Sequence, residues 1–134
     1  MQMVADVDGV RFFNDSKATN VGATLAAISG LSEVAILILG GQSKQQNFET
    51  LTEVIRQKIR TVILIGQDAL IIKAAIEGTG VPVIEASSMA DAVHFAQTRL
   101  DARDHVARLH MRARIDREHG IDGEQIARIA AAGI

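Results

Sequence analysis

The chain has 134 residues, of which 14 are basic and 16 acidic, giving a formal net charge of −2. This length suits one domain with a real core, and the near-neutral charge gives no reason to expect nucleic acid or a membrane surface as a partner. No apolar stretch approaches the roughly 20 residues needed to span a bilayer, and without cysteine there is no disulfide framework or thiolate chemistry. We therefore expect a soluble, cytoplasmic protein.

The first thirty residues predict a hairpin followed by a helix. Apolar segments at 4–7 and 10–14 flank the Asp8-Gly9 pair, which is typical of two-residue turns. A polar loop follows the second segment. Asn20 is then placed to cap a helix that Gly30 ends.

Strand-like and helix-like segments then alternate three times with short connections. Apolar or β-branched runs at 34–39, 61–65 and 81–85 predict buried parallel strands. Helical spacing of apolar residues at 48–58, and again after each later strand, predicts the intervening helices. Repeated βαβ units predict a Rossmann-like α/β fold, in which a mainly parallel sheet carries helices on both faces.

Two helix starts carry specific expectations. Asp68 is placed to cap a helix whose predicted apolar face is Leu70, Ile71, Ala74, Ala75 and Ile76. Ser88, with Asp91 three residues later, resembles a capping box, although Glu or Gln is usual at the second position.

The composition of the sequence changes after residue 100, where arginines and acidic residues become frequent. Ala102, Val106, Leu109 and Ala113 recur at helical spacing among arginines and acids, which predicts an amphipathic helix. A last helix is expected at 124–132. We therefore divide a single domain, 1–134, into an α/β part at 1–100 and a helical tail at 101–134.

Two polar loops, at 14–20 and 40–47, follow predicted parallel strands and should share one edge of the sheet. Lys17 and Lys44 would bring two ammonium groups to that edge, near helix N-termini, which favours a phosphate or carboxylate site. Gly40-Gly41 can allow backbone to approach a ligand or can be only a tight strand exit. Asp15, beside Lys17, can hold a ribose hydroxyl, a metal-bound water or only its neighbour's charge, and a lone loop carboxylate of this kind can also be structural or solvated.

Several kinds of site are not indicated. The chain has neither a Gly-x-x-x-x-Gly-Lys-Ser/Thr loop nor a Gly-x-Gly-x-x-Gly motif, so a self-sufficient nucleotide site is not expected. The four histidines lack the spacing of a helical zinc site, and Ser16 has no identifiable base partner. We assign no metal ligand and no catalytic residue.

Three motifs together carry a family resemblance. These are Asp-Ser-Lys-Ala-Thr-Asn at 15–20, Gly-Ala-Thr at 22–24, and Gly-Gly-Gln-x-Lys at 40–44 with Phe48 after it. They closely resemble the C-terminal domain of the UDP-N-acetylmuramoyl-L-alanine:D-glutamate ligases, which belong to the Mur ligase family of peptidoglycan synthesis. The resemblance covers roughly residues 3–100 and implies a Rossmann-like domain that receives the incoming amino acid and closes over ATP.

The resemblance also implies a mechanism and residue roles. ATP converts the acceptor carboxylate to an acyl phosphate, and the amine of D-glutamate attacks it to form an amide. By this resemblance Thr19 and Lys44 bind the glutamate carboxylates, whereas Asp15 and Lys17 face the nucleotide. The family's phosphate loop, magnesium ligands and UDP site lie in two other domains. We therefore expect no tightly bound ATP or Mg²⁺ here, and no ligation by this chain without the central ATPase domain.

The tail departs from the family pattern. Where the family has a strand and a Ser-Pro-Ala-x-Ala-Ser-x-Asp segment, this chain has 104–110 followed by Ala113-Arg114-Ile115-Asp116, with Arg114 at the position of a glutamate-binding serine. Two alternatives therefore stay open. One is a rearranged or engineered non-enzymatic fragment that self-associates through its helical tail because the sheet has lost its last strand. The other is a generic anion-binding module without D-glutamate preference.

Overall fold

The computed structural model describes residues 2–7, 9–15, 20–41, 46–99, 108–114 and 128. Within these residues the chain forms one sheet in the order β1-β2-β6-β3-β4-β5. The strands are β1 (Gln2–Val7), β2 (Val10–Asn14), β3 (Ala35–Gly41), β4 (Ile59–Ile65), β5 (Val83–Glu85) and β6 (Arg108–Arg114). Only β1 runs antiparallel to its neighbour among the described pairs, so the mainly parallel sheet and the N-terminal hairpin are confirmed.

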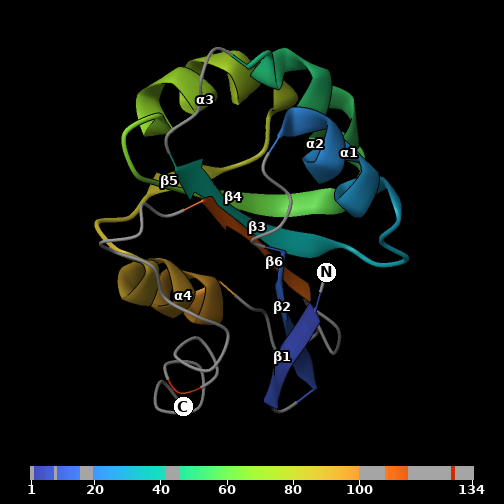
Figure 1. Ribbon diagram of the computed structural model, residues 1–134, viewed down its shortest axis with the longest axis vertical. Coiled ribbons are helices and arrows are strands. Elements are labelled where there is room, and N and C mark those ends of the chain that lie inside the picture. Colours follow the sequence, from blue (N-terminus) through green and yellow to red (C-terminus); the bar gives the residue numbers. More distant parts are fainter. Residues whose placement is uncertain are drawn as a thin grey trace.

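Helices cover both faces of the sheet, as expected for a Rossmann-like fold (Figure 1). The first face carries α1 (Val21–Ser29), α2 (Thr52–Lys58) and α3 (Ala69–Ile76), while α4 (Met89–Thr98) covers the other. Short 3₁₀ turns precede α2 and follow α3, as η1 (Phe48–Leu51) and η2 (Glu77–Thr79). Among the described residues, no helix has the length and apolar character to cross a membrane.

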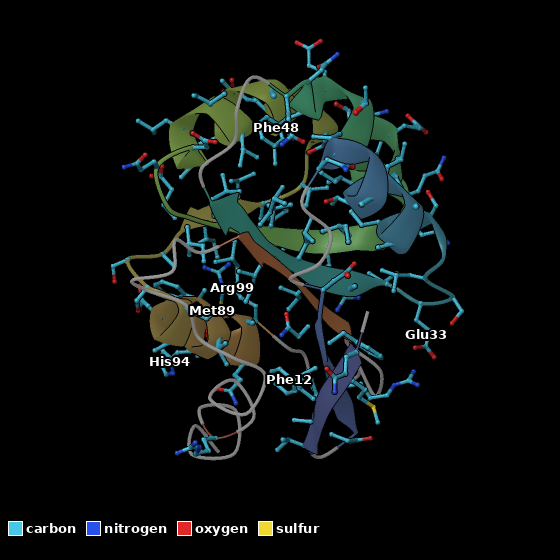
Figure 2. All side chains as sticks on the ribbon, in the orientation of Figure 1. Phe12, Glu33, Phe48, Met89, His94 and Arg99 are labelled. Carbon is cyan, nitrogen blue, oxygen red and sulfur yellow. The ribbon has the colours of Figure 1, made fainter. Side chains whose placement is uncertain are left out.

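Alternate residues of the central strands build two separate hydrophobic cores. Leu37 and Leu39 of β3 pack with residues of α1, η1, α2 and α3 in the first. Ile36 and Ile38, the intervening residues, pack against α4 in the second. This two-sided burial explains why residues 35–39 read as one continuous apolar run. Figure 2 shows Phe48 in the layer above the sheet and Met89 on α4 below it.

The β1–β2 hairpin forms where the turn chemistry predicts it. Val7 and Val10 face each other across the ladder, and Gly9 between them has φ 82. That left-handed conformation carries no steric penalty for glycine, so the residue fits the position. Phe12 on β2 is 1% exposed and belongs to the α4-side core, which anchors the hairpin to the domain.

The predicted apolar face of α3 is right at Ala75 and Ile76 but wrong at Leu70, Ile71 and Ala74, and it omits Ile72. Ile72 and Ile76 are buried, whereas Leu70 and Ile71 are 69% and 61% exposed. Seven of the eight residues of α3 are apolar, so periodicity could not select a face, and the position of the helix on the sheet selected it instead. Asp68 stands at the predicted N-cap position, but its side chain makes no capping hydrogen bond.

The expected amphipathic helix is also wrong over residues 108–114, which form strand β6. The backbone of β6 pairs in parallel with β2 on one side and β3 on the other. Without this strand, β2 and β3 would present unpaired N–H and C=O groups across the middle of the sheet. The self-association alternative assumed that the sheet had lost its last strand, but β6 occupies that position. The other expected tail elements lie outside the described residues, except that Arg128 is helical.

Candidate functional site

The two polar loops begin at one edge of the sheet, as the parallel strands predict. The loop that contains Lys17 follows β2, and the loop that contains Lys44 follows β3. Strands β2, β6 and β3 are parallel, so their carboxyl ends lie together. Residues 16–19 and 42–45 lie outside the described residues, so the positions of Lys17, Thr19 and Lys44 stay predictions. The residues on either side of each loop are described.

Asp15 is a nearly buried carboxylate at this edge. It directly follows β2 and is 8% exposed. Because a buried charge is costly unless polar groups surround it, this is not the environment of a solvated loop residue. The structure thus removes the solvated alternative for Asp15, while the nucleotide-facing role stays a prediction.

Gly40 has a structural requirement that involves no ligand. A Cβ added at this residue would lie 2.0 Å from the backbone oxygen of Ile65 and 2.8 Å from its carbonyl carbon. Gly40 and Ile65 are register partners at the ends of β3 and β4. The close approach of these strands therefore accounts for Gly40 as part of a tight strand exit. A backbone contact from Gly41 to a ligand stays a prediction.

The N-terminus of α1 is where the two loops meet. The side-chain oxygen of Asn20 accepts a hydrogen bond from Ala23 N at 2.8 Å, which confirms the predicted cap. Gln46, at the end of the second loop, accepts a hydrogen bond through Oε1 from Val21 N at 2.6 Å. Two of the helix's otherwise unpaired N–H groups are thus satisfied, one from each loop.

Gln46 was not singled out from the sequence. It lies in a polar tract with Gln42, which belongs to the Gly-Gly-Gln-x-Lys motif, and Gln45, and nothing in the local pattern singles out Gln46. Its partner Val21 is 25 residues away in the sequence. A long-range side-chain contact of this kind has no periodic signal, so only the fold reveals it.

A third loop, which leads from β5 into α4, is organised by its own side chains. Ser88 Oγ accepts a hydrogen bond from Asp91 N at 3.0 Å, as the capping-box prediction requires. The carboxylate of Asp91 accepts from the backbone N and the hydroxyl of Ser87, at 3.0 and 3.1 Å, one residue earlier than in the usual motif. In the described part of the chain, no group of three or more His, Asp or Glu side chains could hold a metal ion.

Comparison with known proteins gives one family. The family model described as "Mur ligase, glutamate ligase domain" matches residues 1–108. The match ends at the first residue of β6, so most of that strand lies beyond it.

Three similar curated proteins are each named UDP-N-acetylmuramoylalanine--D-glutamate ligase. The protein from Ralstonia nicotianae is 46% identical over 106 residues, which is 79% of this chain and 21% of the relative. That from Albidiferax ferrireducens is 48% identical over 99 residues, 72% of this chain and 20% of the relative. That from Thiobacillus denitrificans is 45% identical over 107 residues, 79% of this chain and 23% of the relative. The chain spans about a fifth of the length of these relatives.

Proposed function

Since this chain belongs to the glutamate ligase domain family of the Mur ligases, we propose that it is the D-glutamate-receiving C-terminal domain of an ATP-dependent ligase of peptidoglycan synthesis. The single observation that carries this proposal is the junction at α1, where both motif-bearing loops end against one helix N-terminus. The names of the relatives supply the substrate class. ATP and UDP-linked precursors place this chemistry in the cytoplasm.

The proposed ligand suits the residues assigned to it. D-glutamate carries two carboxylates, and the Lys44 ammonium and the Thr19 hydroxyl are donors of the kind that bind them. Thr19 lies two residues before the start of α1, whose N-terminal N–H groups favour negative charge. In the proposed reaction the amine nitrogen of D-glutamate bonds to the carbonyl carbon of the acyl phosphate. The bond between that carbon and the phosphate oxygen breaks, and inorganic phosphate leaves. The positively charged nitrogen then loses one proton to give the neutral amide.

The nucleotide would meet this chain at Asp15 and Lys17. The carboxylate of Asp15 is nearly buried at the sheet edge. Its oxygens can accept a hydrogen bond from a ribose hydroxyl or from a water bound to magnesium. Lys17 would offset phosphate charge. ATP, when bound, supplies the phosphoryl group that activates the acceptor carboxylate. Because the relatives are about five times longer than the matched segment, we propose that ligation needs the rest of such an enzyme, including its ATPase domain.

A ligand titration followed by NMR tests the proposal on the chain itself. D-glutamate should shift the amide signals of residues 16–21 and 40–47, and L-glutamate at the same concentrations should shift them less. Lys44→Met should abolish the D-glutamate shifts. Lys73→Met, the same change at an exposed position on α3, should preserve them.

The other outcomes separate the alternatives. Equal responses to D-glutamate, L-glutamate and inorganic phosphate would support a generic anion-binding module in place of a D-glutamate domain. No response at either loop, at ligand concentrations in the tens of millimolar, would overturn retained substrate recognition.

A further inference from the structure

We propose that the outward side of α3, formed by Leu70, Ile71 and Ala74, is the surface by which this domain contacts the rest of a ligase chain. This inference rests on the proposed function, because the partner is the remaining part of the same enzyme. The surface, called here the α3 outer face, does not need to touch D-glutamate. It holds the domain against the part of the enzyme that carries ATP and the acceptor.

The composition of α3 is that of a helix covered on two sides. Seven of its eight residues are apolar, and helices that are apolar all round are normally buried. Ile72 and Ile76 pack in the core on the sheet side. Leu70 and Ile71 are instead 69% and 61% exposed. Ala74, which is also exposed, lies one turn later on the same side, so the described residues leave an apolar strip open to solvent.

The first turn of α3 lies at the same edge of the sheet as the candidate site. β4 is parallel to β3, and its last residue, Ile65, is the register partner of Gly40 at the exit of β3. α3 begins at Ala69, four residues later, on the face of the sheet that also carries α1 and α2 (Figure 1). A body that closes over this edge would therefore meet Leu70 and Ile71 as well.

The other large apolar side chains that are exposed in the described part of the chain lie elsewhere. Met3 is on β1 in the hairpin, and Val34 directly precedes β3 at the amino edge of the sheet. Each stands alone, and single exposed apolar residues are ordinary on a protein surface. Leu70 and Ile71 are consecutive and are more exposed than either. Among these residues, only the α3 pair combines a cluster with a position beside the site.

The length of the relatives identifies what covers the α3 outer face. This chain spans about a fifth of the ligases that it matches, so most of such an enzyme lies outside it. The proposed reaction requires the part that binds ATP and the acceptor to reach the carboxyl edge of this sheet. Lys73 is the one charged residue of α3, so the helix suits an apolar partner surface better than a charged one. A second copy of this chain is the competing occupant.

The test joins the full chain to the ligase of Ralstonia nicotianae in place of the segment that it matches. Leu70→Gln and Ile71→Gln are introduced together, since glutamine keeps good helix propensity but is polar. Val34→Gln is the matched control, because it makes the same kind of change at an exposed apolar residue on the opposite edge. Phosphate release that depends on D-glutamate, in the presence of ATP and UDP-N-acetylmuramoyl-L-alanine, gives kcat and KM.

Cysteine labelling gives a second readout that does not need activity. The chain has no cysteine, so Ile71→Cys and Val34→Cys each introduce one reactive thiol into it. The rate of maleimide labelling at each residue is followed by mass spectrometry, in the isolated chain and in the fusion with ATP and the acceptor bound. Ile71→Cys should react more slowly in the fusion than in the isolated chain. Val34→Cys should react equally fast in both.

The double glutamine variant should lower the kcat of the fusion by about tenfold, the size expected when a large aliphatic side chain loses its burial. It should leave the D-glutamate response of the isolated chain unchanged, because the α3 outer face contacts the partner and not the ligand. Val34→Gln should change neither property. Full activity of the double variant in an active fusion would overturn the inference.

Failure of the inference and failure of the proposed function look different. If the unaltered fusion releases no phosphate in response to D-glutamate, the proposed function fails, and the α3 outer face is judged on labelling alone. Equal labelling of Ile71→Cys in the fusion and in the isolated chain would overturn the inference. Protection that appears in the isolated chain and grows with its concentration would also overturn it, because a second copy would then be the occupant.

Discussion

Gly40→Ala should be among the most destabilising single-methyl additions in this domain. The new Cβ would lie 2.0 Å from the backbone oxygen of Ile65. A carbon and a carbonyl oxygen rest about 3.3 Å apart or farther, so β3 and β4 must separate by roughly 1.3 Å at this pair. Because the obstacle is backbone in a central strand pair, no side-chain rotation relieves it. We expect a cost of about 3 kcal/mol, at the upper end for overpacking.

Thermal unfolding measures this cost directly. A loss of that size should lower the Tm of a domain of this length by about 10–15 °C. Gly78→Ala is the control, because a Cβ added there would meet no atom within 4 Å, and its Tm should stay within about 3 °C of the parent. If Gly40→Ala and Gly78→Ala melt together, the close approach of β3 and β4 is not what requires glycine at residue 40.

Two further substitutions test packing and charge elsewhere in the fold. Ile72→Ala should lower the free energy of unfolding by about 3 kcal/mol because Ile72 is 2% exposed. Ile71→Ala, at an exposed position, should change it by no more than about 0.5 kcal/mol. Equal losses for the two variants in denaturant titrations would contradict the observed face of α3. Arg11 and Glu33 form an ion pair at 2.7 Å with side chains 30% and 35% exposed. A double-mutant cycle with Arg11→Met and Glu33→Gln should give a coupling of about 0.5–1 kcal/mol that falls in 1 M salt, and a coupling that salt leaves unchanged would argue against this reasoning.

Features set by neighbouring residues in the chain were predictable. The Asn20 cap and the Ser88 cap each depend on a side chain within a few positions of the backbone group that it serves, and the turn of the hairpin places glycine at a positive φ, at Gly9. The parallel strands were equally predictable from their apolar runs. Because both faces of the sheet are buried, polar and apolar residues do not alternate along these strands. These local signals together specify the Rossmann-like α/β fold.

Features set by distant parts of the chain were not predictable in the same way. α3 is apolar on nearly every side, so the choice of Ile72 over Ile71 as an inward residue depends on where the sheet lies. Residues 108–114 fit both a helical spacing and the strict alternation of Leu109, Met111 and Ala113. The open position between β2 and β3 decides in favour of the strand, since tertiary pairing outweighs local propensity.

The loop that carries Lys44 is constrained at both ends by contacts that need no ligand. Gly40 lies just before it, where β3 approaches the backbone of β4, and Gln46 lies just after it, bonded to α1. A substitution at either end should therefore move the loop, whether or not that residue meets the substrate. It follows that weakened D-glutamate binding in a Gly40 variant would not by itself show a glycine–ligand contact. Only substitution within the loop, as in Lys44→Met, separates recognition of the ligand from positioning of the loop.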